Sequence, residues 1–146
     1  MSTARDDRPT RTTGAPARLS WAGVPGVGQL DGGWWPRSTD VAVELEQLLA
    51  ACPQEQGRVS RVSLCSADWP LPHPTRSVQR GLPVKVGWFS GMERHTVTLG
   101  SSAIGARRTL LLVVPEGTTE AQAERDLAAA STPTSQRTTQ LLAALA

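Results

Sequence analysis

Hydrophobic residues recur every three or four positions along residues 40–51, which is the spacing of an amphipathic helix. The apolar stripe consists of Val41, Leu45, Leu48, Leu49 and Cys52. Candidate N-caps precede it at Ser38, Thr39 and Asp40. Pro53 ends the helix because the residue before a proline avoids the α conformation. Glu44 lies off the stripe, so the pattern puts its carboxylate on the polar side.

A second helix is predicted within residues 115–130, PEGTTEAQAERDLAAA. Thr119 and Gln122 have the spacing of a capping box at its start. The hydrophobic side of this helix consists mostly of alanine plus Leu127, so it must either pack closely or be held weakly. Residues 132–146 are expected to form a C-terminal tail that could include a short helix.

Six further segments have the composition or the two-residue alternation of β-strands. They are residues 17–22, 29–35, 58–65, 84–89, 94–100 and 108–114. Gly32 and Gly33 interrupt the second segment and indicate a bulge or the close approach of another backbone. The last segment is apolar on both faces, which suits a central strand. Residues 66–83 contain four prolines and are predicted to form a long loop.

The elements occur in the order strand, strand, helix, four strands and helix. Because consecutive strands with short turns favour antiparallel neighbours, we expect an α+β fold. It would be a small, mostly antiparallel sheet of about five or six strands with two helices. The chain of 146 residues suits one domain, which we place at residues 17–131. Residues 1–16 have the composition of a disordered N-terminal tail.

Composition and hydropathy limit the class of protein. The chain is 39% hydrophobic and 19% charged, which is typical of a globular domain. It has no apolar run of about 18 residues, so we expect no membrane-spanning helix and no membrane partner. The start of the chain lacks the apolar core of a secretory signal, and we therefore expect a cytoplasmic protein.

Positive charge is concentrated in the middle of the chain. The formal net charge is +2, whereas residues 58–108 alone carry eight basic and two acidic residues. A basic region can attract an anionic partner, but Lys and Arg also protect strand edges as solvated residues. Because no Lys/Arg-rich run of about five to eight residues is present, a nucleic-acid partner is not the first expectation.

Common signatures of catalysis and metal binding are missing from the sequence. It contains neither a Gly-rich phosphate loop with its lysine nor the glycine-flanked serine of hydrolases. Cys52 and Cys65 are separated by twelve residues, and His73 and His95 lie in different contexts, so we expect no metal and no cofactor. The two thiols are expected to be reduced and buried, although sequence alone leaves a disulfide open.

The stretch LDGGWWPRS concentrates unusual residues in a chain with five tryptophans, no tyrosine and one phenylalanine. Trp34 and Trp35 point to opposite faces if the stretch is extended, so at least one is expected in the core. Asp31 could accept backbone hydrogen bonds in a turn or bind a ligand. Arg37 could pair with Asp31 or Asp40, or could bind a carboxylate, a phosphate or a ring.

The quoted stretch, the strand VKVGWF and the segment TLLLVVPEGT together resemble an uncharacterised actinobacterial domain-of-unknown-function family. The marks of that family are a DGxWWPRS motif, a GWF strand and an LLVVPP-like strand before the last helix. The resemblance covers about residues 18–130, and Glu116 stands where a second proline is common. It implies one cytoplasmic α+β domain from a high-GC bacterium, but it implies no activity and no catalytic residue.

Three functions are compatible with these observations. The first is a non-enzymatic binding or regulatory protein of the bacterial cytoplasm, whose DGGWWPRS surface contacts a small molecule or a protein. Its candidate binding residues are Asp31, Trp34, Trp35, Arg37, Trp88 and His95. The second is a hydrolase or transferase in which Asp31 or Asp68 acts with His95. The third is a weak nucleic-acid binder with stacking indoles, for which one open face must carry Arg58, Arg61, Lys85 and Arg94.

Overall fold

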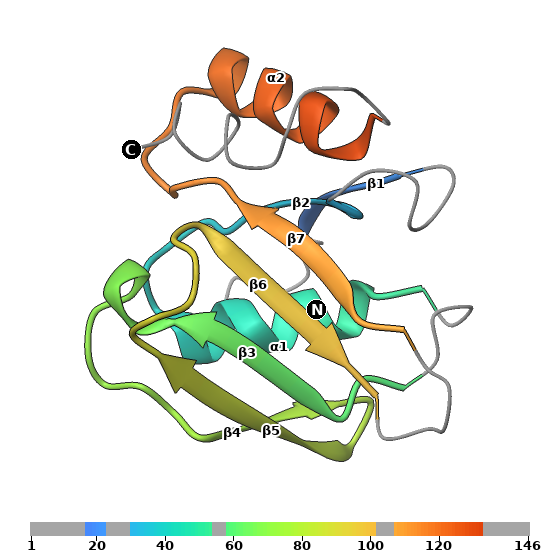
Figure 1. Ribbon diagram of the computed structural model, residues 1–146, viewed down its shortest axis with the longest axis vertical. Helices are drawn as coiled ribbons and strands as arrows, with labels where there is room; N and C mark the ends of the chain where they lie inside the picture. The colour runs from blue at the N-terminus through green and yellow to red at the C-terminus, as the bar shows by residue number, and fades with distance from the viewer. Residues whose placement is uncertain (1–16, 23–29, 54–57, 102–106, 133–146) are drawn as a thin grey trace, which may run out of the picture.

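The computed structural model describes residues 17–22, 30–53, 58–101 and 107–132, and within them seven strands form one curled sheet (Figure 1). The strands are β1 (Arg18–Trp21), β2 (Gly32–Trp35), β3 (Arg61–Cys65), β4 (Arg76–Gln79), β5 (Leu82–Phe89), β6 (Thr96–Gly100) and β7 (Thr109–Val113). The helices are α1 (Val41–Ala51), α2 (Glu120–Ser131) and the short 3-10 helix η3 (Ser66–Asp68). The predicted N-terminal tail at 1–16 and residues 133–146 of the predicted C-terminal tail lie outside the described residues.

The α+β class is confirmed, but the predicted sheet is wrong in strand number and in pairing. The described residues form seven strands in the order β1-β2-β7-β6-β3-β5-β4, and the sheet is mixed. β2 pairs in parallel with β7, and β3 pairs in parallel with β5. Parallel pairing requires a long connection that brings the chain back to the same end of the sheet. Residues 66–81 provide it between β3 and β5.

The strand missing from the prediction is β4, which lies in the segment expected to be a loop. β4 and β5 form an antiparallel hairpin whose two turn residues are Arg80 and Gly81. Both have positive φ angles, of 50° and 82°, as a type I′ hairpin turn requires. The usual first residue of such a turn is Asn, Asp or Gly, so an arginine there and the preceding prolines concealed the hairpin in the sequence.

α1 covers one face of the sheet, which we call the inner face. The predicted apolar stripe is confirmed, because Leu45, Leu48 and Leu49 are completely buried in the main hydrophobic cluster. Asp40 is the N-cap residue, as the sequence allows, although its side chain makes no capping hydrogen bond. Cys52 follows this helix as a buried cysteine that forms no disulfide with any described residue.

Glu44 is the exception to the predicted helix pattern, because it is buried with 2% exposure. Its carboxylate accepts hydrogen bonds from the backbone N–H of Arg37 at 3.0 Å and from the hydroxyl of Ser38 at 2.8 Å. The carboxylate thus points back along the chain and fixes the segment that joins β2 to α1. Because each carboxylate oxygen has a hydrogen-bond donor, the carboxylate can be buried without leaving an unpaired acceptor. Glu44 is therefore buried although it lies off the apolar stripe.

α2 packs against the opposite face, the outer face, but only over β1, β2 and β7 (Figure 1). Thr119 is its N-cap, and its hydroxyl accepts a hydrogen bond from the backbone N–H of Gln122 at 3.3 Å. The helix approaches β2 closely at Gly33, where an added Cβ would lie 2.9 Å from Cδ2 of Leu127 and 3.3 Å from Cβ of Ala130. Small residues on both elements therefore bring α2 close to the sheet.

The two glycines continue β2 instead of interrupting it. Gly32 has a φ angle of 156°, and an added Cβ would lie only 2.0 Å from the carbonyl oxygen of Ser20 on β1. The predicted close approach of another backbone is therefore confirmed at Gly32, whereas the close neighbours of Gly33 are side chains. A residue with a side chain at position 32 would separate the two strands.

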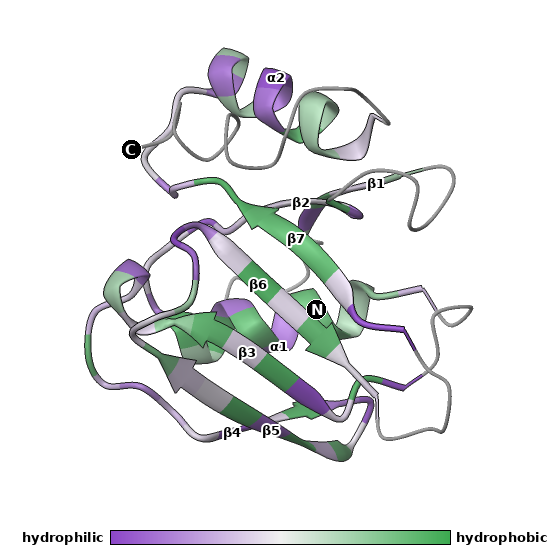
Figure 2. Ribbon diagram, viewed as in Figure 1, coloured by the Kyte–Doolittle hydropathy of each residue, from purple (hydrophilic) through white to green (hydrophobic). Residues whose placement is uncertain are grey.

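β7 is apolar on both faces, as predicted, and Figure 2 shows it as a hydrophobic strand in the sheet. Leu111 belongs to the cluster on the inner face, and Leu112 belongs to the cluster between α2 and the outer face. Over β6, β3, β5 and β4, neither α1 nor α2 covers the outer face. No helix of the described residues is long and apolar enough to cross a membrane.

Candidate functional site

The tryptophan pair lies in the interior. β2 places Trp34 on the inner face and Trp35 on the outer face, as the alternation predicts, and their exposures are 1% and 9%. The Trp34 ring stacks on Trp69 with 5.7 Å between the ring centroids. Both indoles make the contacts of core residues, and any role of theirs in binding stays a prediction.

Arg18 on β1 covers the outer side of Trp35. Its guanidinium carbon lies 3.5 Å from the centroid of the indole, which is the geometry of a cation–π contact. The same group donates hydrogen bonds to the carbonyl oxygens of Trp35 at 3.0 Å and Pro36 at 2.9 Å. Burial, and then the positive charge of Arg37, lower the pKa of Arg18. Arg18 thus covers Trp35 and binds the backbone up to Pro36.

Asp31 is also buried, at 8% exposure, immediately before β2. Its carboxylate accepts hydrogen bonds from Nη2 of Arg107 at 2.6 Å and from the backbone N–H of Leu110 at 2.9 Å. The predicted pairing of Arg37 with Asp31 or Asp40 is wrong, since among the described residues the Arg37 guanidinium has no ion pair. Asp31 therefore joins the starts of β2 and β7.

Asp68 lies next to His95, as the enzyme hypothesis requires, but it binds the backbone and not the ring. One carboxylate oxygen accepts the backbone N–H of His95 at 2.6 Å, and the other is bound by Nε of Arg94. This hydrogen bond raises the pKa of Arg94. His95 precedes β6 with a φ angle of 63°, so it is not part of the strand that the sequence predicted over residues 94–100. The contacts of Asp68 stabilise a turn.

Trp88 is separated from the tryptophan pair in the strand order, because β7, β6 and β3 lie between β2 and β5, although it packs against the hydrophobic cluster that contains Trp34. Its Nε1 donates a hydrogen bond to the carbonyl oxygen of Pro74 at 2.7 Å. Its ring stacks on His73, with 4.0 Å between centroids and 12° between planes. Both side chains hold the proline-rich connection against the sheet. The structure therefore divides the six predicted site residues among separate places.

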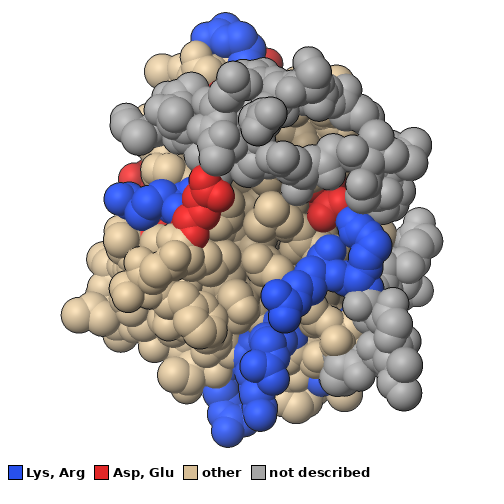
Figure 3. All heavy atoms as spheres, viewed as in Figure 1, with Lys and Arg blue, Asp and Glu red and all other residues tan. Residues whose placement is uncertain are grey.

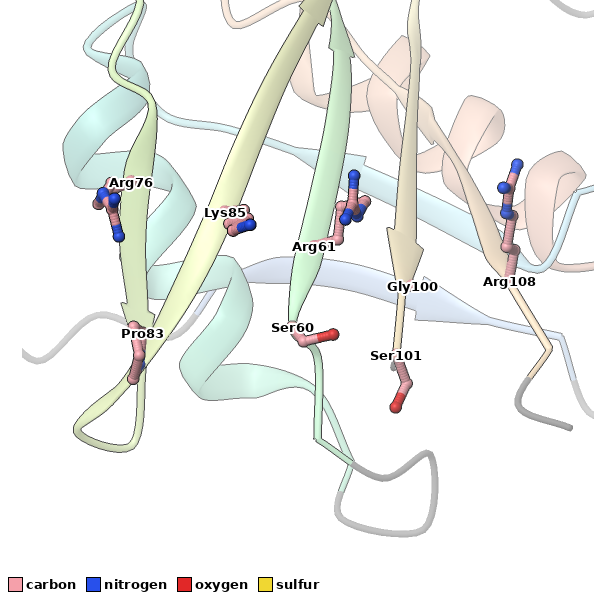
Figure 4. A pocket seen from close by; sticks show the side chains of 8 residues that line it. All are labelled: Ser60, Arg61, Arg76, Pro83, Lys85, Gly100, Ser101 and Arg108. Atoms are coloured by element: carbon pink, nitrogen blue, oxygen red, sulfur yellow. The ribbon is translucent and has the colours of Figure 1, made fainter. Parts of the chain in front are cut away.

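A different group of side chains comes together on the uncovered outer face. Arg76 on β4, Lys85 on β5 and Arg61 on β3 are direct register partners, and such partners project from the same face of a sheet. Figure 4 shows them side by side, and we call these three residues the cation row. All three are exposed, and within the described part of the chain none of them forms an ion pair.

The cation row borders a pocket of about 480 Å³, which we call the cation pocket (Figure 4). Its lining residues are Ser60, Arg61, Arg76, Pro83, Lys85, Gly100, Ser101 and Arg108. Gly100 on β6 is the register partner of Arg61, and an added Cβ there would come no closer than 4.0 Å to its nearest neighbour. Space for the pocket thus remains next to Arg61, because its register partner on β6 has no side chain. Figure 3 shows Lys and Arg as a band across this face.

Sequence reasoning found this site only in part. Of the four cations required by the nucleic-acid hypothesis, Arg61 and Lys85 are neighbours, but Arg58 donates to the carbonyl oxygen of Pro83 and Arg94 is paired with Asp68. None of the five tryptophans is exposed. The contributions of Arg76 and Arg108 were missed. The alternation around β3 and β5 indicates outward-pointing cations, but their alignment depends on a parallel pairing that local patterns do not reveal.

Comparison with known proteins gives one match. A family model described as a family of unknown function (DUF5994) matches residues 18–130, which confirms the resemblance to a domain of unknown function. No curated protein and no solved structure matches the chain.

Proposed function

The chain belongs to the DUF5994 family of unknown function, and we propose that it is a binding protein that holds an anionic ligand on the outer face of its sheet. The observation that carries this proposal is the cation row. Three positive side chains occupy neighbouring positions on adjacent strands, although like charges placed directly opposite one another destabilise a sheet. An anion between them would remove that repulsion.

Protection of sheet edges does not account for this arrangement. Of the three strands, only β4 lies at an edge, whereas β3 and β5 are each paired on both sides. Lys85 and Arg61 therefore have no exposed strand edge to protect. Their charges are also not used within the described residues, in contrast to Arg94 and Arg107, which are bound by Asp68 and Asp31.

The pocket supports the proposal by its size and its polar groups. About 480 Å³ is within the range of small-molecule sites, and the hydroxyl-bearing residues Ser60 and Ser101 line it together with the cations. Arg presents several donors in one plane, which suits phosphate and carboxylate oxygens. The residues that line the cation pocket supply positive charge and hydrogen-bond donors, which can hold an anion. The proposal is therefore one of binding and includes no reaction.

Calorimetric titration with inorganic pyrophosphate at low salt tests this function. We expect binding that weakens about tenfold or more in Lys85→Gln, since a hydrogen bond to a charged group contributes about 1.5–3 kcal/mol. Gly100→Val should weaken binding as well, because it fills the pocket without changing a charge. The matched control is Arg125→Gln, since Arg125 is an exposed cation on α2 that does not line the pocket. The proposal is wrong if pyrophosphate does not bind, or if the control weakens binding as much as Lys85→Gln.

A further inference from the structure

One aromatic ring lies exposed next to the cation row. Phe89, at the end of β5, is 52% exposed, and among the described residues no other aromatic side chain is in the exposed class. Its ring extends back over Gly87, where an added Cβ would lie 2.9 Å from Cε2 and 3.1 Å from Cζ. Gly87 has no side chain to displace the ring, so the ring of Phe89 lies close to the sheet at Gly87 while about half of the residue stays exposed.

The ring and the cations border connected pockets. A second pocket of about 460 Å³ contains Phe89 and shares Arg61, Gly100 and Arg108 with the cation pocket. A third, of about 240 Å³, joins Phe89 to Arg76 and Lys85. The outer face therefore offers one continuous surface with positive charge at one end and an aromatic ring at the other.

The spacing along this surface follows from the strands. Gly87, beneath the ring, is two residues from Lys85 on the same face of β5, which corresponds to roughly 7 Å at about 3.3 Å per residue. Ser63 and Thr98 are half-buried and lie beside Gly87 in the same cross-strand row, because Ser63 is the register partner of both Gly87 and Thr98. The cations thus occupy one row across the face, and the aromatic ring with two hydroxyl groups beside it occupies the next row.

We infer that the anionic ligand is a mononucleotide, with its phosphates on the cation row, its ribose near Ser63 and Thr98 and its base against Phe89. This inference rests on the proposed function and adds the class of ligand. A nucleotide joins its phosphates to a flat base through a ribose that carries hydroxyl groups, and bases stack readily on exposed aromatic rings. Single-stranded nucleic acid fits less well. Proteins that bind it provide several aromatic rings for successive bases, whereas the described residues of this face provide one exposed ring.

Comparing three ligands by calorimetry at low salt tests the inference: ADP, inorganic pyrophosphate and adenosine. ADP should bind roughly 5- to 150-fold more tightly than pyrophosphate, which is the gain from stacking one base. Phe89→Ala should lower the affinity for ADP to that for pyrophosphate and leave pyrophosphate binding unchanged. Phe89→Tyr should retain tight ADP binding. Because the ring is half exposed, both variants should fold, which their circular dichroism spectra will verify.

The possible results separate this inference from the proposed function. If pyrophosphate binds but ADP binds no more tightly, or if Phe89→Ala does not affect ADP, the nucleotide assignment is wrong and anion binding stands. If neither ligand binds, the proposed function fails as well. A twelve-nucleotide single strand that binds far more tightly than ADP would overturn the assignment in favour of a polymer.

Discussion

Replacing Lys85 by glutamine should stabilise the folded protein, although it is expected to weaken ligand binding. Lys85 lies between Arg76 and Arg61 in the register of three adjacent strands, so it has a like charge on each side. Strands are about 4.8 Å apart, and we take the charged ends of the long side chains to be roughly 7 Å apart. Each pair then repels by about 0.6 kcal/mol in water. Removing the central charge relieves two such pairs.

The expected gain in the free energy of unfolding is therefore about 1 kcal/mol at low ionic strength. It should fall to about half of that near 0.15 M salt and almost vanish at 1 M, where the Debye length is about 3 Å. Urea denaturation is the suitable assay because urea, unlike guanidinium chloride, adds no ions. Arg125→Gln is the control, since Arg125 donates to Oε1 of Gln122 at 2.8 Å on α2 and is not part of the row.

Two results would refute this reasoning. The first is a Lys85→Gln variant that is no more stable than the natural protein at low salt, which would mean that the three charges do not repel measurably. The second is an equal gain at low and high salt, which would point to a cause other than charge, such as a change in side-chain packing on the strand.

Three further predictions follow from packing and burial. Gly32→Ala should destabilise the protein by several kcal/mol, because its Cβ would clash with the Ser20 carbonyl oxygen 2.0 Å away. Urea unfolding will measure the loss, and a value below about 0.5 kcal/mol, typical of a surface site, would contradict the prediction. Trp34→Ala and Trp35→Ala should each cost about 3–5 kcal/mol, and unchanged unfolding midpoints would show that the pair does not anchor β2. Burial raises the pKa of Cys52 from 9.0 to about 11. Its thiol should therefore resist alkylation at pH 8 in the folded protein, and rapid alkylation of the native protein would contradict this. The free energy of unfolding should also fall as the pH rises from about 9 towards 11, and Cys52→Ala should not show this fall.

Local periodicity predicted the features that depend on one segment alone. The stripe of α1 is an example, because the positions of Leu45, Leu48 and Leu49 on one helical face follow from their spacing. The opposite orientations of Trp34 and Trp35 follow in the same way from strand alternation. These predictions needed no knowledge of what each element packs against.

Features that depend on distant segments could not be predicted. The burial of Glu44 depends on donors that precede the helix, and its distance from the apolar stripe gave the opposite expectation. The β4–β5 hairpin has an Arg-Gly turn that lacks the common turn signature. The cation row unites residues from three strands, two of which are paired in parallel across a long connection. Its charges are visible in the sequence, but their alignment is a property of the fold.

The attachment of α2 gives the molecule two regions of unequal stability. The helix buries Ala123 and Ala130 and part of Leu127, so it removes little apolar surface from water in comparison with the three leucines of α1. Segments with few apolar contacts open at a lower free energy than the rest of a domain. When α2 detaches, Trp35 loses the part of its cover that this helix provides, while Trp34 stays enclosed by α1 and Trp69. One peptide bond thus joins two neighbouring indoles that report on separate unfolding events.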